Sequence, residues 1–137
     1  MAAQAIKSDR LPIRTSEDVV IVRQHVRKIA LEIGLSLVDQ TKVVTAASEI
    51  ARNTLIHGGG GWVNVELVDQ FGRKGVRAIF EDSGPGIPDI GRALQDGFTT
   101  GSGLGLGLGG AKRLSNDFEI SSAPGQGTRI ALTRWKT

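Results

Sequence analysis

Two long stretches of the 137-residue chain repeat hydrophobic residues every three or four positions, which is the period of an amphipathic helix. The first covers residues 15–33, begins at a hydroxyl side chain that can cap it, and is followed by glycine. The second covers residues 37–57 and is followed by the glycines at 58–61. Shorter helices are predicted at 89–96 and 111–118. The pattern therefore indicates two main helices and two minor ones.

The other hydrophobic segments predict strands. Residues 62–68 and 76–82 alternate apolar and polar side chains around a turn near 70–75, so we expect a hairpin. Further strands are expected at 5–14, 118–123 and 128–135, with the turn PGQG at 124–127. This order of elements predicts an α/β (α+β) fold, a two-layer sandwich in which helices cover one face of a mixed, largely antiparallel sheet. Neither a linker nor an internal repeat interrupts the pattern, so we expect one domain over residues 1–137.

The composition narrows the classes of function. The absence of cysteine excludes a disulfide framework and a thiolate zinc site. No apolar run is long enough to cross a bilayer, and the N-terminal segment MAAQAIKSDR lacks the apolar core of a signal peptide, so we expect a cytoplasmic protein with no membrane partner. The net charge of +3 is compatible with a polyanionic ligand such as a nucleotide, but an ordinary solvated surface is the simpler explanation of the charge alone. With two tryptophans, four phenylalanines and no tyrosine, a platform for stacking nucleic-acid bases is disfavoured.

The segment GSGLGLGLGG at 101–110 is the least ordinary stretch of the sequence. It is not a P-loop, because Ala111 stands where a P-loop has the lysine that follows its last glycine. The spacing Gly105-x-Gly107-x-x-Gly110 satisfies the dinucleotide-binding fingerprint only as a string. No apolar strand precedes it, and no acid remains beyond Glu119 to hold a ribose. Both familiar explanations of a glycine-rich loop therefore fail.

Successive glycines that run into a helix can still turn several backbone N–H groups toward one point, where the helix N-terminus adds a partial positive charge. We therefore interpret Gly103–Gly110 as a phosphate-binding segment, with a structural tight turn as the alternative. We expect a mobile lid that becomes ordered when a phosphate ligand binds. Leu104, Leu106 and Leu108 would anchor the closed lid to the core.

The second main helix carries a carboxylate and an amide one turn apart. Glu49 and Asn53 are separated by four positions and lie beside the apolar arc of that helix, not opposite it. The carboxylate is a candidate general base, and the amide oxygen is a candidate ligand for a hard cation such as Mg²⁺. A solvated glutamate near an asparagine gives the same pattern, so the pair alone does not distinguish a catalytic site from an ordinary helix surface.

The segment EDSGPGIPD follows the second strand of the predicted hairpin. Asp82 is in phase with the apolar residues of that strand and so ends an inward-facing row. Because an unpaired acid is costly to bury, an adenine amino group is a suitable partner, and Gly84 and Gly86 would let a flat base approach the backbone. The alternative is an aspartate that starts a tight turn. Thr128, in GQGT, is either a further ligand-facing group or a turn cap.

Together and in this order, the motifs resemble the GHKL (Bergerat-fold) ATPase and kinase superfamily. The matching segments are Glu49–Asn53 for its N-box, Asp82–Gly86 for its first glycine box, Gly103–Gly109 for the second and Gly125–Thr128 for the third. Within the superfamily, SEIARN, EDSGPGIPDI, DGFTTGSGLGLGL and GAKRLSNDF are similar to the RsbT-type switch kinases, which are serine/threonine kinases of bacterial stress signalling. The resemblance extends from about Ile13 to Trp135.

The resemblance implies a Bergerat ATP-binding fold with a role for each motif. Asp82 would bond the adenine amino group, with Thr128 helping through water, and Gly84 and Gly86 would line the same site. Asn53 would bind a Mg²⁺ ion that bridges the phosphates. Glu49 would be the catalytic base that accepts the proton of a Ser or Thr hydroxyl as its oxygen attacks the γ-phosphate. The residues that would wrap the phosphates are Gly103, Leu104, Gly105, Leu106 and Gly107.

The resemblance also implies partners. A kinase of this type phosphorylates a protein built on the sulfate-transporter and anti-sigma-antagonist domain, and the freed kinase then binds an output protein, typically a phosphatase. Two alternatives stay open: an anti-sigma kinase that binds a sigma factor directly, and a nucleotide-dependent binding module with vestigial catalysis. If an arginine assists the transfer, Arg52 or one from the partner is the candidate. His57 is expected to be a core or capping residue.

Overall fold

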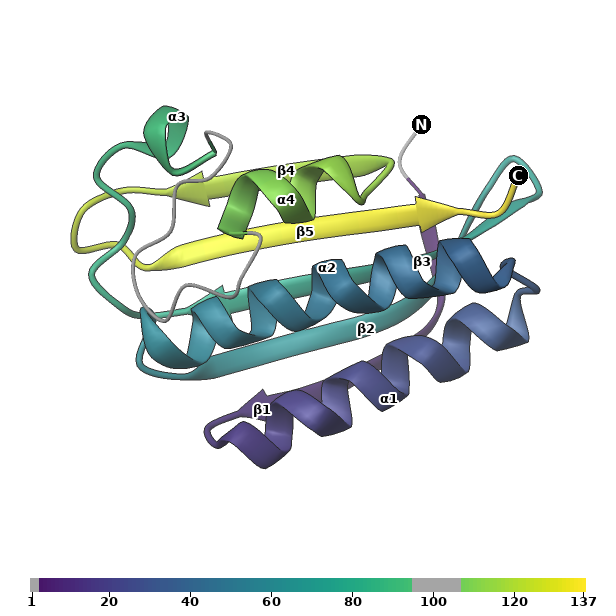
Figure 1. Cartoon of the computed structure of the whole chain (residues 1–137), viewed down its shortest axis with the longest axis horizontal. Helices are drawn as coiled ribbons and strands as arrows, with labels where there is room; N and C mark the ends of the chain where they lie inside the picture. Colours follow the sequence, from purple (N-terminus) through teal and green to yellow (C-terminus); the bar gives the residue numbers. More distant parts are fainter. Residues whose placement is uncertain (1–2, 95–106) are drawn as a thin grey trace.

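A computed structural model of the chain describes residues 3–94 and 107–137. In these two stretches the helices and strands follow one another as β1 (Gln4–Ile13), α1 (Ser16–Glu32), α2 (Leu37–Ile56), β2 (Gly61–Gln70), β3 (Arg73–Asp82), α3 (Ile90–Ala93), α4 (Gly107–Arg113), β4 (Asp117–Ser122) and β5 (Thr128–Trp135). Figure 1 shows α1, α2 and α4 lying over the strands. The two main helices and the hairpin are confirmed.

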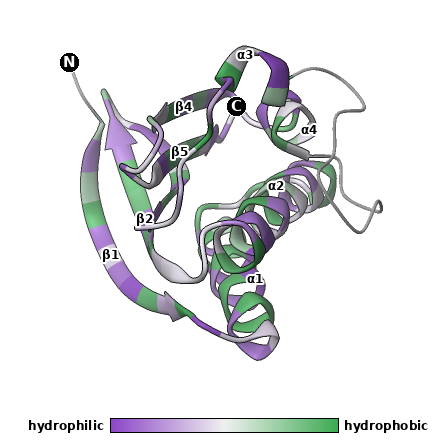
Figure 2. Ribbon diagram, turned by 90° about the vertical axis from the view of Figure 1, so that its left-hand side faces the viewer, coloured by the Kyte–Doolittle hydropathy of each residue, from purple (hydrophilic) through white to green (hydrophobic). Residues whose placement is uncertain are grey.

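The strands form one twisted sheet in the order β1-β2-β3-β5-β4. Every pairing between described strands is antiparallel, as expected for a largely antiparallel sheet. Seen along the layers in Figure 2, the sheet lies on one side and the helices on the other. The predicted two-layer α+β fold is therefore confirmed.

Both main helices begin at a hydroxyl cap, which the sequence predicts for the first of them. The Thr15 side chain accepts a hydrogen bond from the backbone N–H of Asp18, whose carboxylate in turn accepts from the Thr15 backbone N–H, which completes a capping box. Ser36 caps α2 by accepting from the backbone N–H of Asp39. The two helices then pack their apolar faces on β2, β3 and β5. The largest fully buried side chains of this inner layer include Phe80, Ile50 and Leu132.

The predicted helix at 111–118 is wrong in its bounds. Helix α4 runs from Gly107 to Arg113, and Asp117 already belongs to β4. Gly109 and Gly110 are buried within α4, and this helix packs against α2. Asn116 ends the helical path, because its backbone N–H donates to Thr133 and its side-chain oxygen accepts from the backbone N–H of Trp135. Tertiary pairing with β5 therefore prevails over local helix preference.

The outer face of the sheet, which no described helix covers, carries both tryptophans. Trp62 lies beneath the guanidinium groups of Arg10 and Arg14, 4.7 and 5.3 Å from the ring centroid. Trp135 lies at the other end of this face, only 4% exposed, and its Nε1 donates to Asp117 over 2.6 Å. A second, small buried layer therefore exists away from the main core.

An ion pair ties the start of α2 to the end of β5. The Arg134 Nη2 atom lies 2.7 Å from Oδ1 of Asp39, and its Nη1 donates to the backbone carbonyl of Leu114, just after α4. Three elements of the structure thus meet at one guanidinium group. The hydrogen bond from Arg134 holds the pKa of the Asp39 carboxyl below its usual value.

We expect Asp39→Asn to lower the free energy of unfolding by about 1 kcal/mol at pH 7. A carboxyl whose pKa is lower in the folded protein stabilises it at pH values above the unfolded pKa, and this contribution is lost as the pH falls through the folded pKa. Urea unfolding at pH 7 and in the acid range checks this. The difference between wild type and variant should shrink in acid, whereas the control Glu119→Gln, an exposed carboxylate of β4, should follow wild type at pH 7. A difference that stayed constant with pH would contradict the assignment.

Candidate functional site

The ends of three neighbouring strands bring polar side chains into one row. Asp82 on β3 is paired in register with Thr128 on β5, and Thr128 is paired with Ser122 on β4. Because side chains alternate along a strand, this row lies on the same inner face as Phe80 and Ile130, which are buried. The sequence prediction that Asp82 ends an inward-facing row is confirmed by this register.

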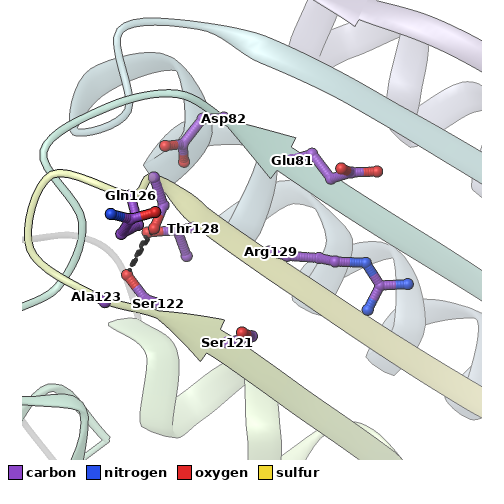
Figure 3. A pocket seen from close by; sticks show the side chains of 9 residues that line it. Glu81, Asp82, Ser121, Ser122, Ala123, Gln126, Thr128 and Arg129 are labelled. Atoms are coloured by element: carbon purple, nitrogen blue, oxygen red, sulfur yellow. Dashed lines mark hydrogen bonds between the residues drawn. The ribbon is translucent and has the colours of Figure 1, made fainter.

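A pocket of about 240 Å³ lies at these strand ends. Figure 3 shows Asp82, Thr128 and Ser122 close together at its inner side, with Gln126 beside them and Arg129 pointing away. Glu81, Ser121 and Arg129 belong to the opposite face of the sheet by their alternate positions, so the pocket continues round the edge of the strands. Most of the side chains that line the pocket are polar, and two of them, Glu81 and Asp82, are carboxylates.

The Asp82 carboxylate is held in place from two sides. Its Oδ1 accepts a hydrogen bond of 2.9 Å from the backbone N–H of Gly84. On its other side lies Gly58, the second residue after α2, so close that a Cβ placed there would collide with the carboxylate carbon and Oδ2. The end of α2 and the end of β3 are therefore in direct contact through a residue without a side chain.

We expect Gly58→Ala to weaken nucleotide binding about tenfold or more, because the added methyl group displaces the Asp82 carboxylate. The φ angle of Gly58 is not in the left-handed region, so the effect comes from the contact rather than from backbone strain. Titration with ATP by calorimetry checks this. Gly91→Ala is the matched control, since a Cβ there reaches nothing nearer than a carboxylate oxygen of Asp89 at 3.5 Å. Equal ATP affinities of wild type and Gly58→Ala would contradict the expected position of the adenine base next to Asp82.

Three glycines of the first and third motifs lie against the protein's own backbone. Gly86 has a φ of +80° and faces the carbonyl of Ala123, and Gly127 has a φ of +76° and faces the carbonyl of Asp82. Gly84 approaches the backbone of Gly58 in the same way. Each of these positions needs glycine for packing, whatever further contact Gly84 and Gly86 make with a ligand.

Glu49 and Asn53 lie along α2 on the approach to Gly58. One helical turn separates them, a rise of about 6 Å, and both are half-buried. The Glu49 side chain is 14% exposed, and its Oε1 lies 3.6 Å from Nη1 of Arg52. Neither Glu49 nor Asn53 lines the 240 Å³ pocket. Glu49, the candidate general base, is thus connected to Asp82, the candidate adenine-binding residue, through the part of the chain from Glu49 along α2 to Gly58.

The remaining predicted positions fall in and around the glycine-rich segment. Gly103, Leu104, Gly105 and Leu106 lie outside the described residues. Gly107 is the first residue of α4, with a φ of +69°. Leu108 is buried in the main core, at the position where the sequence predicts an anchor.

Two residues of this region were missed from sequence. Gly58 was interpreted only as part of a helix stop, although four successive glycines signal a close backbone approach as well. Ser122 was interpreted only as a strand residue, although its hydroxyl contacts three other segments. His57 is the C-cap residue of α2, as expected for a capping role.

The described residues contain no group of three or more His, Cys, Asp or Glu side chains that could hold a metal ion by themselves. Asn53 and Glu49 still offer two oxygen donors within one turn. Such a sparse set fits Mg²⁺ bound mainly through substrate phosphates and water, since this ion commonly uses only one or two protein ligands. None of the helices that the structure describes is both long and apolar enough to span a membrane.

Comparison with known proteins identifies the family of the chain. Residues 38–136 match the family described as "Histidine kinase-, DNA gyrase B-, and HSP90-like ATPase". The chain is 46% identical to the serine/threonine-protein kinase RsbT of Bacillus subtilis over 123 residues, which cover 90% of this chain and 92% of that protein. It is 30% identical to an anti-sigma F factor of Bacillus licheniformis over 87% of this chain and 85% of that protein.

Solved structures show the same fold. The RsbU and RsbW domains of a Mycobacterium tuberculosis protein match 96% of this chain with a TM-score of 0.64 and 24% identity, and this chain covers 33% of that one. A chain of the SiaB–SiaC complex of Pseudomonas aeruginosa matches with a TM-score of 0.57 and 14% identity, over 96% of this chain and 91% of that one. The chain therefore belongs to the histidine kinase-, DNA gyrase B- and HSP90-like ATPase family, and within it resembles the RsbT-type serine/threonine kinases.

Proposed function

We propose that the protein is a Mg-ATP-dependent protein serine/threonine kinase of a partner switch in bacterial stress signalling. One observation carries the proposal. Helix α2 presents a carboxylate and an amide one turn apart, and Gly58, the second residue after this helix, lies against the Asp82 carboxylate, which lines a polar pocket. The 46% identity to a serine/threonine-protein kinase supports the same activity. We extend the proposal to one cytoplasmic kinase domain over residues 1–137.

In this proposal the nucleotide base binds at the strand ends. The Asp82 carboxylate accepts a hydrogen bond from the adenine amino group, and Thr128 assists through a water molecule. Gly84 keeps the carboxylate in place, because its N–H already donates to Oδ1. The phosphates then extend along α2 toward Asn53, and the segment from Gly103 to Gly107 closes on them.

The Asn53 amide oxygen is the proposed protein ligand of Mg²⁺, which neutralises charge on the phosphates when bound. Glu49 is the proposed general base. Its carboxylate accepts the proton of a substrate Ser or Thr hydroxyl while that oxygen forms a bond to the γ-phosphorus, and the bond to the β,γ-bridging oxygen breaks to release ADP. The guanidinium group of Arg52 lies 3.6 Å from this carboxylate.

The proposed substrate is a protein with a sulfate-transporter and anti-sigma-antagonist domain, and the proposed output partner is a phosphatase. Incubation of the protein with labelled ATP, Mg²⁺ and such a domain tests the proposal directly. Label should appear on a serine or threonine of the domain and should be absent when either ATP or the domain is omitted. Absence of transfer to any such domain, with ATP bound, would contradict the kinase assignment.

A second candidate is an anti-sigma kinase that binds a sigma factor directly. The observation that favours it is the 30% identity to a protein named anti-sigma F factor. A stable complex with a sigma factor and none with a phosphatase, measured by size-exclusion chromatography, would favour this candidate. A binding module with vestigial catalysis is the third reading, and the half-buried Glu49 on the proposed phosphate side of α2 speaks against it.

A further inference from the structure

Helix α2 exposes an apolar side chain at each of its ends. Val38, in the first turn, is 63% exposed, and Ile56, the last residue of the helix, is 58% exposed. In Figure 1 the helix extends along much of the sheet, so these two side chains lie far apart. Neither belongs to the main core. Packing within the described part of the chain therefore does not account for their apolar character.

The two side chains point in the same direction. Val38 and Ile56 are 18 positions apart, which in an α-helix makes about five turns and a rise of about 27 Å. Glu49 comes about three turns after Val38 and two turns before Ile56, and its direction differs from theirs by only about 20°. The candidate general base thus lies on a stripe of α2 that has an apolar side chain at both ends. We call the line from Val38 to Ile56 the α2 stripe.

The α2 stripe faces away from the core along its whole length. The positions between its ends are exposed or half-buried: Thr41, Thr45, Ser48, Glu49 and Arg52. The opposite side of α2 packs into the main core and is closed to a partner. A protein that presents a hydroxyl group to Glu49 must therefore approach along the α2 stripe, where its surface would also meet the apolar ends.

We propose that the α2 stripe is the docking surface for the acceptor protein, with Val38 and Ile56 as two apolar contacts that place the acceptor hydroxyl at Glu49. The inference rests on the proposed kinase function. The occupant is a compact domain, since a domain of about 100 residues has a radius of gyration of about 13 Å and is wide enough to touch both ends. Its surface should carry an apolar patch on each side of the serine or threonine that is phosphorylated.

Steady-state transfer of labelled phosphate to a sulfate-transporter and anti-sigma-antagonist domain, at saturating ATP, tests the inference. Val38→Gln and Ile56→Gln replace an apolar contact by a polar side chain that favours a helix. Each should raise the KM for the domain by about fivefold and leave kcat within about twofold of wild type. The double variant should raise the KM by about 25-fold, because such distant contacts contribute independently.

Two kinetic results would overturn the proposal. The first is an unchanged KM in the double variant, which would show that the domain does not touch the ends of the α2 stripe. The second is a fall in kcat at an unchanged KM, which would place the two residues in the chemistry and not in docking. A loss of ATP affinity in Ile56→Gln, measured by calorimetry and large enough to explain the higher KM, would overturn it as well.

Ile6→Gln is the matched control. Ile6 is also an exposed isoleucine, 54% exposed, but it lies on β1 and not on α2. This variant should have the KM and kcat of wild type. A rise in its KM equal to that of Ile56→Gln would show that loss of any exposed apolar side chain has the same effect, and would contradict a specific docking surface.

Direct binding of the domain separates this inference from the kinase proposal. If wild type binds the domain in the presence of ATP but transfers no phosphate, the kinase proposal fails. The docking surface still stands if Val38→Gln and Ile56→Gln together weaken that binding, measured by calorimetry, by about 25-fold. Binding that is equal in wild type and the double variant would overturn the docking surface alone. A wild-type dimer that becomes a monomer in the double variant, seen by size-exclusion chromatography, would assign the α2 stripe to a second copy and overturn the proposal.

Discussion

Glu49→Gln is expected to lower the rate of phosphate transfer to a protein substrate by about 10²- to 10⁴-fold, the range typical of a lost general base. The amide is nearly the same size as the carboxylate but cannot accept the proton of the attacking hydroxyl. Because Glu49 lies along α2 and outside the pocket that contains Asp82, ATP affinity should stay within about twofold of wild type. Single-turnover transfer of labelled phosphate and calorimetric titration with ATP measure the two quantities separately.

The control for Glu49→Gln is Glu17→Gln, which removes an exposed carboxylate from the first turn of α1. It should transfer phosphate at the wild-type rate. Equal rates for Glu49→Gln and wild type would remove Glu49 from the mechanism. A loss of ATP binding in Glu49→Gln as large as the loss of transfer would instead assign Glu49 to the nucleotide site.

Asp82→Asn is expected to weaken ATP binding by about 10- to 100-fold, which corresponds to loss of one hydrogen bond to a charged group. The asparagine side chain can turn its NH₂ group toward the adenine amino group, where two donors would meet. The amide oxygen of the new side chain can still accept from the backbone N–H of Gly84, as Oδ1 of Asp82 does, so the turn should persist and the loss should be specific to the ligand. Calorimetry with ATP, and urea unfolding without it, distinguish these two effects.

Asp69→Asn is the matched control, because it removes a carboxylate from β2 at the opposite end of the sheet, where Asp69 pairs with Lys74. Its ATP affinity should equal that of wild type. Undiminished affinity in Asp82→Asn would refute the adenine assignment. A fall in the free energy of unfolding large enough to account for the lost binding would assign Asp82 to the stability of the turn.

The sequence predicts the parts of this fold whose determinants are local. The period of the apolar residues locates α1 and α2, a hydroxyl cap also marks the start of α1, and the alternating segments locate the β2–β3 hairpin. The bounds of α4 could not be obtained in this way. Its end depends on hydrogen bonds between Asn116 and β5, a segment that follows later in the chain.

The residues of the candidate site also differ in whether they can be recognised from a short segment of sequence. Glu49, Asn53 and Asp82 stand out because their spacing and their place on a helix or strand are visible in one short segment. Gly58 and Ser122 do not, since their importance comes from neighbours in other segments, the carboxylate of Asp82 in one case and the amide of Ile87 in the other. The roles of the predicted site residues remain predictions for the experiments above.

The two tryptophans on the outer face of the sheet give the protein a built-in pair of optical reporters. Trp62 is paired in register with Glu81, the neighbour of Asp82. Its indole therefore lies on the outer face of the sheet, opposite the proposed adenine site. Trp135 is paired with Gly75 at the far end of the same face. With no tyrosine in the chain, selective excitation is not needed, and replacing either tryptophan by phenylalanine leaves the other as a single emitter. Fluorescence can thus follow one end of the sheet independently of the other.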